Sequence, residues 1–184
     1  MDFKPQLILG IGNSDAKYEN TYHNVGILLV SDIIERHNAS LVFTGKKMKL
    51  YKVGSKFLAT SSCFMNVSGE AIAEALKFKK IPPEELLVAQ DDSDLPLGTF
   101  RFSFERGSAG HKGIDSIFKV IGGRNFWRVR IGIRPLRNGK PSTQKAGGFV
   151  LKKISPAHKK VLQKAFVEVE TIVKLKENDA EPSG

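Results

Sequence analysis

The sequence is short of cysteine: Cys63 is its single example among 184 residues. One cysteine cannot form an intramolecular disulfide, and it excludes a zinc site built from several thiolates. Apolar runs are short as well, because nowhere do about 18 consecutive apolar residues follow one another. Residues 1–6 have neither the basic and apolar regions of a secretion signal nor an Arg- and Ser-rich amphipathic stretch. These absences predict a cytoplasmic protein without a membrane span.

Acidic residues are outnumbered. The 29 Lys and Arg residues face 19 Asp and Glu residues, which gives a net charge of +10 and a pI near 9.7. An excess of this size favours polyanions such as nucleic acids, through phosphate contacts and counterion release. A basic surface that merely maintains solubility is the alternative. The length and the 41% hydrophobic content predict one domain over residues 1–176, followed by a disordered tail over residues 177–184.

Short apolar runs alternate with segments of helical period, which is typical of an α/β fold. We therefore expect a single domain with one mixed, twisted sheet and helices on both of its faces. Predicted strands cover residues 6–11, 50–53, 57–61, 86–89, 99–104 and 127–133. The last two alternate apolar with polar or basic side chains, so each should have one polar face. Helices are predicted to begin at Val25, at Ser68 as N-cap, and at Ser155-Pro156, the last with an inward stripe that includes Ile172.

Asn13 and His23 follow the first predicted strand, at the place where an open α/β sheet forms its ligand crevice. The imidazole of His23 has an ordinary pKa near neutrality, which suits proton transfer at cellular pH. The glycines of Gly10-x-Gly12 also suggest a dinucleotide-binding loop. That interpretation is disfavoured because Asp15 stands where the third glycine of the fingerprint is required.

An acidic cluster, residues 91–94, follows the predicted strand over residues 86–89. A carboxylate at this place can accept a hydrogen bond from His23, fix its tautomer and favour its protonated form. A hard-cation site is the alternative, but the cluster lacks the glycine and the terminal glutamate of a calcium loop. Asp92 and Asp94 also fit the role of turn or capping residues.

Four motif regions occur in a specific order and spacing. They are Gly10-x-x-Asn13 with His23-Asn24-x-Gly26, Phe64-Met65-Asn66-Val67-Ser68-Gly69, Asp91-Asp92-Ser93-Asp94-Leu95-Pro96, and Gly107-Ser108-Ala109-Gly110-His111-Lys112-Gly113. In this combination the chain resembles the bacterial-type peptidyl-tRNA hydrolases over residues 6–150. The resemblance implies hydrolysis of the ester bond between a peptide and tRNA. It also implies that the reaction needs no cofactor and no metal, and it favours a monomer.

The resemblance also implies roles for individual residues. His23 corresponds to a general base that activates water, and Asp91 to the residue that orients it. Arg101 and Arg130, on the polar sides of two strands, correspond to contacts with tRNA phosphates. The expected substrate-binding residues are Asn13, Tyr18, Met65, Asn66, His111 and Lys112.

The chain departs from the family pattern at three positions: Ser14 replaces a usual proline, Gln90 a frequent histidine, and Lys112 a usual asparagine. A protonated lysine cannot accept a hydrogen bond, but it can donate to a phosphate or an oxyanion. Its charge would also lower the pKa of a nearby His23. Two alternatives remain open at this point, a non-catalytic RNA-binding protein on the same scaffold and an esterase for small substrates.

Overall fold

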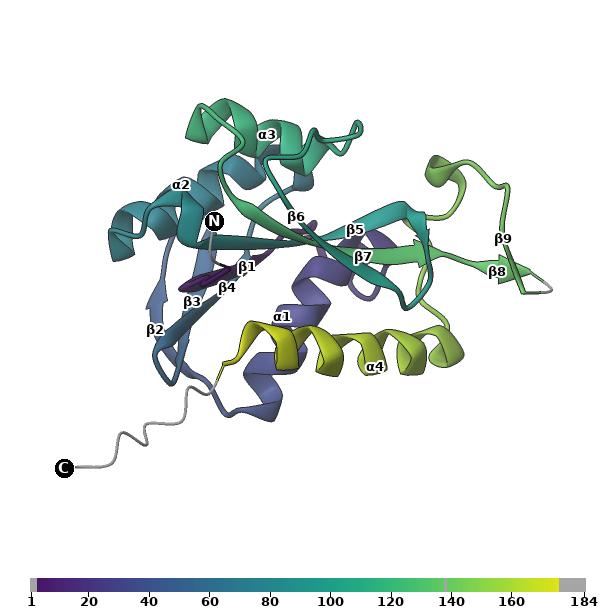
Figure 1. Cartoon of the computed structure of the whole chain (residues 1–184), viewed down its shortest axis with the longest axis horizontal. Helices are drawn as coiled ribbons and strands as arrows, with labels where there is room; N and C mark the ends of the chain where they lie inside the picture. The colour runs from purple at the N-terminus through teal and green to yellow at the C-terminus, as the bar shows by residue number, and fades with distance from the viewer. Residues whose placement is uncertain (1–2, 138, 176–184) are drawn as a thin grey trace.

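The computed structural model describes residues 3–137 and 139–175, and a seven-stranded mixed sheet forms its centre (Figure 1). The strands are β1 (Leu7–Gly10), β2 (Ser40–Thr44), β3 (Met48–Val53), β4 (Lys56–Ser61), β5 (Leu86–Pro96), β6 (Phe100–Phe104) and β7 (Trp127–Arg134). Their order across the sheet is β2-β3-β4-β1-β5-β7-β6. The four central strands are parallel, and antiparallel pairs complete the two edges. A separate hairpin of β8 (Leu136–Arg137) and β9 (Lys140–Pro141) projects beyond β7 (Figure 1).

Helices cover both faces of the sheet. They are α1 (Val25–Arg36), α2 (Ser68–Lys79), α3 (Lys112–Ile121) and α4 (Pro156–Val173). One apolar core lies under α1 and α4, and the other lies under α2 and α3 (Figure 1). Successive side chains of β1 enter opposite cores, with Ile8 in the first and Leu7 and Leu9 in the second. The predicted α/β fold, a mixed sheet with helices on both faces, is confirmed.

Two glycines let α1 approach the sheet closely. A Cβ atom on Gly26, in the first turn of α1, would lie 2.2 Å from the carbonyl oxygen of Ala89 in β5. A Cβ atom on Gly10, at the end of β1, would lie 2.3 Å from the carbonyl oxygen of Gly26. Larger residues would push the helix away from both strands. The Gly10-x-Gly12 spacing thus serves helix packing, and this packing brings His23, just before α1, close to Asp91 of β5.

Three predictions about these elements were wrong. β5 does not end at residue 89, because the next residues still pair with β7 as far as Pro96. Ser68 is the first residue of α2 rather than its N-cap, and its hydroxyl donates to the carbonyl oxygen of Met65. Ile172 is 46% exposed and lies outside the inward stripe of α4. The predicted start of the last helix at Ser155-Pro156 is confirmed, and the hydroxyl oxygen of Ser155 caps α4 by accepting the backbone N–H of His158.

β2 and α3 were not predicted at all. β2 is an edge strand with largely exposed side chains, so its sequence has no apolar alternation to mark it. The sequence of α3 does contain the apolar periodicity of a helix, since Ile114, Ile117 and Phe118 lie at helical spacing and face the second core. None of the described helices is long and apolar enough to cross a membrane. The predicted tail over residues 177–184 lies outside the described residues.

Candidate active site

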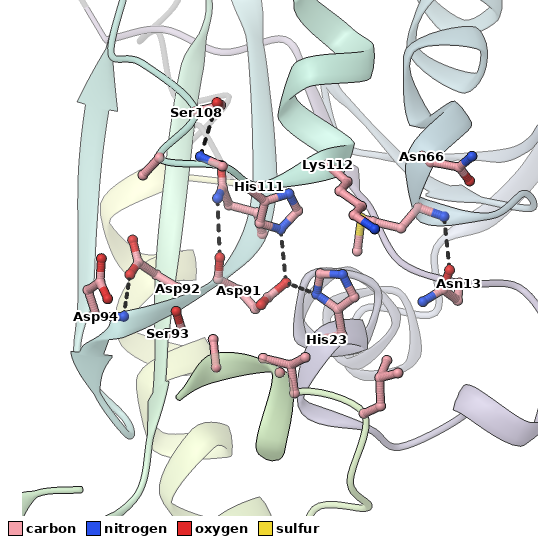
Figure 2. Close-up of a pocket in the computed structure, with 18 of the residues that line it drawn as sticks. Asn13, His23, Asn66, Asp91, Asp92, Ser93, Asp94, Ser108, His111 and Lys112 are labelled. Atoms are coloured by element: carbon pink, nitrogen blue, oxygen red, sulfur yellow. Dashed lines mark hydrogen bonds and ion pairs between the residues drawn. The ribbon is translucent and has the colours of Figure 1, made fainter. Parts of the chain in front are cut away.

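A cleft of about 580 Å³ opens beyond the end of β1, beside β5 and the start of α3 (Figure 2). The loop after β1, the η3 turn (Met65–Val67) and a segment before α4 complete its walls. All eight residues predicted to be catalytic or to bind substrate lie in its lining: Asn13, Tyr18, His23, Met65, Asn66, Asp91, His111 and Lys112. The tertiary structure thus brings together side chains from four separate parts of the sequence.

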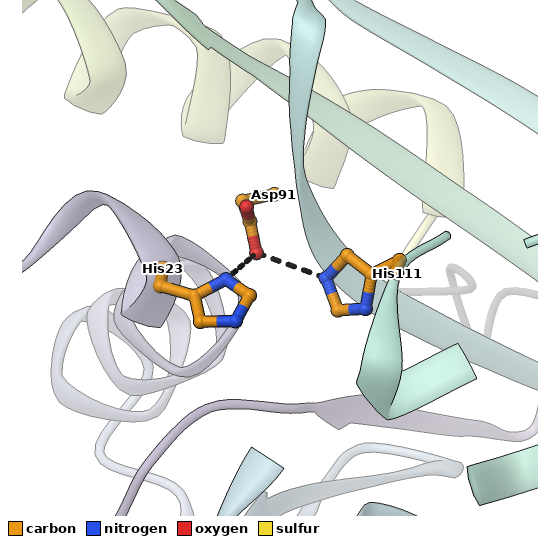
Figure 3. Close-up of side chains that lie close together, drawn as sticks. All are labelled: His23, Asp91 and His111. Carbon is orange, nitrogen blue, oxygen red and sulfur yellow. Dashed lines mark hydrogen bonds and ion pairs between the residues drawn. The ribbon is translucent and has the colours of Figure 1, made fainter. Parts of the chain in front are cut away.

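His23 and His111 share one carboxylate oxygen of Asp91 (Figure 3). Nδ1 of His23 lies 2.7 Å from Oδ1 of Asp91, and Nε2 of His111 lies 3.0 Å from the same oxygen. The centroids of the two imidazole rings are 5.2 Å apart. Since Asp91 is only 3% exposed, the imidazoles rather than water compensate its charge.

The start of α3 fixes the tautomer of His111. His111 is the N-cap of this helix, and its Nδ1 accepts a hydrogen bond of 3.2 Å from the backbone N–H of Gly113. Nδ1 therefore carries a lone pair, and Nε2 carries the proton that is donated to Asp91. His23 in turn donates its Nδ1 proton to Asp91. Its Nε2 is left as a free base on the side of the ring that points away from the carboxylate (Figure 3).

The pKa values of Asp91 and His23 reflect this arrangement. Burial alone would raise the pKa of Asp91, but the charges and hydrogen bonds of His111 and His23 lower it from 3.8 to about 2. Burial alone would lower the pKa of His23, but the hydrogen bond and charge of Asp91 raise it above its ordinary 6.5. Lys112 opposes this rise, because its positive charge lowers the pKa of His23. The side chain of Lys112 projects from the first turn of α3 into the cleft (Figure 2).

The same three side chains are also the group that could hold a metal ion within the described part of the chain. Their ligand atoms, one from each of His23, Asp91 and His111, lie within 4.8 Å of one another. In the arrangement described above, however, the two nitrogens concerned donate protons to Asp91. A metal would have to displace both protons, so the observed hydrogen bonds fit an orienting network better than a ligand set.

Asn24 holds the loop that carries Asn13. Its Oδ1 accepts the N–H of Asn13 and its Nδ2 donates to the carbonyl oxygen of Asn13, both at 2.8 Å. Oδ1 of Asn13 accepts the N–H of Met65 at 2.9 Å, which leaves its Nδ2 as a donor on the side of the residue that faces His23 (Figure 2). Asn24 was missed as a positioning residue, although it stands in the quoted motif directly after His23.

Residues 146–154 support His23 from another side. The N–H of His23 donates to the carbonyl oxygen of Val150 at 2.8 Å, and the N–H of Ile154 donates to that of Asn20 at 2.8 Å. Val150 and Leu151 also line the cleft with apolar surface. No sequence motif marked this segment, because backbone hydrogen bonds provide its main link to His23.

The polar face predicted for β7 is present, but it is buried rather than exposed. Arg130 is 8% exposed, and its Nε donates to Oδ2 of Asp92 at 2.7 Å. Arg128 is 2% exposed. β7 lies inside the sheet, between β5 and β6, so partners from neighbouring segments enclose both guanidinium groups. Arg101 pairs with Arg130 in the register of β6 and β7, and it is exposed on the edge strand.

Comparison with known proteins places this chain in a family. A family model described as peptidyl-tRNA hydrolase matches residues 7–181. The chain belongs to the peptidyl-tRNA hydrolase family. A peptidyl-tRNA hydrolase of Aquifex aeolicus is 38% identical over 171 residues, which cover 90% of this chain and 85% of that relative. One from Actinobacillus pleuropneumoniae is 38% identical over 177 residues, covering 92% and 89%.

A solved structure extends the similarity to the fold. The crystal structure of peptidyl-tRNA hydrolase from Acinetobacter baumannii has a TM-score of 0.80 and 30% identity, with 95% of this chain and 89% of that chain covered. Family membership and a hydrolase class, expected from four motif regions, are therefore confirmed, as is the α/β architecture, expected from the alternation of apolar runs and helical segments. The comparisons give no support to a non-catalytic RNA-binding protein.

The lowered pKa of Asp91 predicts a dependence of stability on pH. Because the pKa falls on folding, the ionised carboxylate stabilises the protein above about pH 4 and loses this effect as the pH falls toward 2. The shift from 3.8 to about 2 corresponds to roughly 2 kcal/mol. Urea unfolding between pH 5 and 2 should show a shallower loss of stability for Asp91→Asn than for the wild type. Identical slopes would contradict the assigned pKa.

Proposed function

We propose that this chain hydrolyses the ester bond of peptidyl-tRNA, with His23 as general base and Asp91 as its orienting carboxylate. The observation that carries the proposal is the state of His23: its Nδ1 is bound to a buried carboxylate, and its Nε2 is a free base in a cleft large enough for a substrate. Such an arrangement sets both the direction and the basicity of the imidazole.

The reaction follows from this geometry. Nε2 of His23 takes a proton from a water molecule, whose oxygen attacks the carbonyl carbon of the ester. The tetrahedral intermediate collapses, the bond to the ribose oxygen breaks, and the proton on His23 passes to that oxygen. Asp91 stabilises the imidazolium that exists between these steps. No metal or cofactor takes part in this scheme.

Neutral amides beside His23 suit the charge that develops on the carbonyl oxygen. The Nδ2 group of Asn13 is a fixed donor, because the rest of that side chain is held by Met65 and its backbone is held by Asn24. Asn66 lies on the same side of the cleft (Figure 2). Donors that are fixed before the reaction stabilise an oxyanion without reorganisation. We assign Asn13 and Asn66 to substrate binding and to the oxyanion.

The cleft also offers apolar surface for the ends of the substrate. Tyr18, Met65, Val150 and Leu151 belong to its lining. These side chains suit a peptide side chain or the terminal adenine of tRNA, for which His111 and Lys112 add polar contacts. A small-ester esterase would need the same chemistry but would leave the basic surface without a use.

The basic charge of the chain is concentrated in one part of the sequence. Residues 116–167 contain thirteen Lys and Arg and no Asp or Glu, so the rest of the chain carries a small negative charge. This segment includes β7, the β8–β9 hairpin and most of α4 (Figure 1). We propose that it and the exposed Arg101 contact tRNA phosphates, while Arg130 is largely neutralised by Asp92. The enzyme is proposed to act as a monomer in the cytoplasm.

His23 provides the main test of this mechanism. His23→Ala should lower kcat by about 10²- to 10⁴-fold, the usual contribution of a positioned base, while tRNA binding stays within a few-fold. Asp91→Asn should be less damaging, because an amide can hold the ring but cannot stabilise imidazolium. His37→Ala, at the far end of α1, is the matched control and should leave turnover unchanged. Near-normal hydrolysis by folded His23→Ala would refute the mechanism.

Lys112 should affect the pH profile. Its charge lowers the pKa of His23, so Lys112→Ala and Lys112→Asn should both move the acidic limb of kcat/KM to higher pH. Asparagine retains a hydrogen-bonding group, and this variant should therefore keep more activity than the alanine variant. The profile is measured from pH 5 to 9 on peptidyl-tRNA. An unchanged limb in both variants would show that the charge of Lys112 does not reach His23.

Arg101 should contribute to tRNA affinity without contributing to chemistry. Arg101→Ala should weaken tRNA binding and reduce the slope of log Kd against log salt by about one, as expected for a lost phosphate contact. Cleavage of a peptide ester of adenosine should be unaffected. Lys77→Ala, on the last turn of α2 away from the cleft, should alter neither quantity. Equal slopes for the Arg101 and Lys77 variants would place the phosphate contacts elsewhere.

A further inference from the structure

Arg128 is a fully buried cation whose partners are neutral. It is 2% exposed and forms no ion pair with a carboxylate in the described part of the chain. Its Nη2 donates to the carbonyl oxygens of Arg106 at 2.6 Å and Gly107 at 3.0 Å, and its Nη1 donates to Oε1 of Gln90 at 3.3 Å. Burying an arginine is costly unless its donors are satisfied, so this placement calls for a reason.

The first two partners belong to the loop between β6 and α3. This loop has unfavourable backbone conformations, because Glu105 and Ala109 both have a positive φ of 51°. It continues into Ser108, Ala109 and Gly110 in the wall of the cleft and then into His111. Arg128 thus holds the loop at its base in the conformation that delivers His111 to Asp91.

Gln90, the third partner of Arg128, also contacts Asp91. Gln90 is 3% exposed, and its Nε2 donates to the carbonyl oxygen of Asp91 at 3.2 Å. Its Oε1 accepts from Arg128 at the same time. The side chains of Gln90 and Arg128 therefore form a continuous bridge from the backbone of Asp91 to the backbone of the loop that ends at His111.

We propose that Arg128 and Gln90 are positioning residues that set the separation of His111 and Asp91 and so hold the catalytic carboxylate in place. This inference rests on the proposed role of Asp91 and His23. Without the bridge, the loop leaves its strained conformation and His111 moves away from Asp91. The carboxylate then keeps one of its two imidazole donors and is free to rotate. Misplacement of a catalytic group by about 1 Å can cost up to about 100-fold in rate.

Two kinds of variant test the proposal on the full-length protein. Arg128→Met removes the guanidinium but keeps an unbranched apolar side chain in place of its aliphatic part. Gln90→Leu breaks the bridge while the loop contacts of Arg128 remain. The control is Lys56→Met, which removes another buried cation bound to a backbone carbonyl, that of Pro5. Lys56 begins β4, at the end of the parallel strands opposite the cleft.

The decisive readout is the hydrogen-bonded ring N–H signal of His111 in the NMR spectrum, measured with kcat and KM for peptidyl-tRNA. Both bridge variants should lose or broaden this signal and lower kcat/KM by about 10- to 100-fold. Lys56→Met should keep the signal and the activity even if its melting temperature falls. If Arg128→Met does not fold, the signal and kinetics of Gln90→Leu alone test the proposal.

A retained signal with normal kinetics in folded bridge variants would overturn the proposal. The NMR result is independent of turnover. If His23→Ala were active, the proposed mechanism would fail, while the ring signal of His111 would still report whether the bridge positions that residue.

Discussion

The arrangement of the candidate active site depends on one buried negative charge. The carboxylate of Asp91 is almost fully buried, and two imidazole N–H groups compensate its charge. This requirement sets the positions of His23 and His111, and the backbone N–H of Gly113 fixes the tautomer of His111. The free Nε2 of His23 is the chemical result. In the proposed mechanism, the hydrogen bond from His23 both compensates the charge of Asp91 and orients the base.

Several packing features deliver these groups to one place. Gly10 and Gly26 let α1 lie almost against β1 and β5, which brings His23 to the carboxylate. The backbone of Val150 holds His23 from outside. On the other side, His111 caps α3, whose start is connected through a strained loop to the buried Arg128. Apart from the local cap of α3, these contacts join segments that are distant in sequence.

The basic segment and the residues of the proposed catalytic site lie in different parts of the sequence. The acid-free stretch over residues 116–167 supplies most of the positive potential that a polyanion would meet, whereas Asp91 lies in β5, outside that stretch. A protein that bound RNA without hydrolysis would need the basic segment but not the pair of imidazoles on a buried carboxylate. The coexistence of both features, together with family membership, is what an RNA-directed hydrolase requires.

The sequence by itself determined the alternation of strands and helices, the basic character and the set of catalytic candidates, because these depend on local periodicity and residue type. It did not determine that β5 continues through Asp91, that Arg130 and Arg128 are buried, or that Asn24 and Val150 hold the site. Those features depend on residues that are close in space but distant in sequence, which local patterns do not encode. Arginines on an alternating strand look solvent-exposed until the tertiary structure places a carboxylate or a carbonyl oxygen opposite each of them. Tertiary structure also gave His111 its place, because one carboxylate oxygen can serve two histidines only when β5, the turn before α1 and the start of α3 converge.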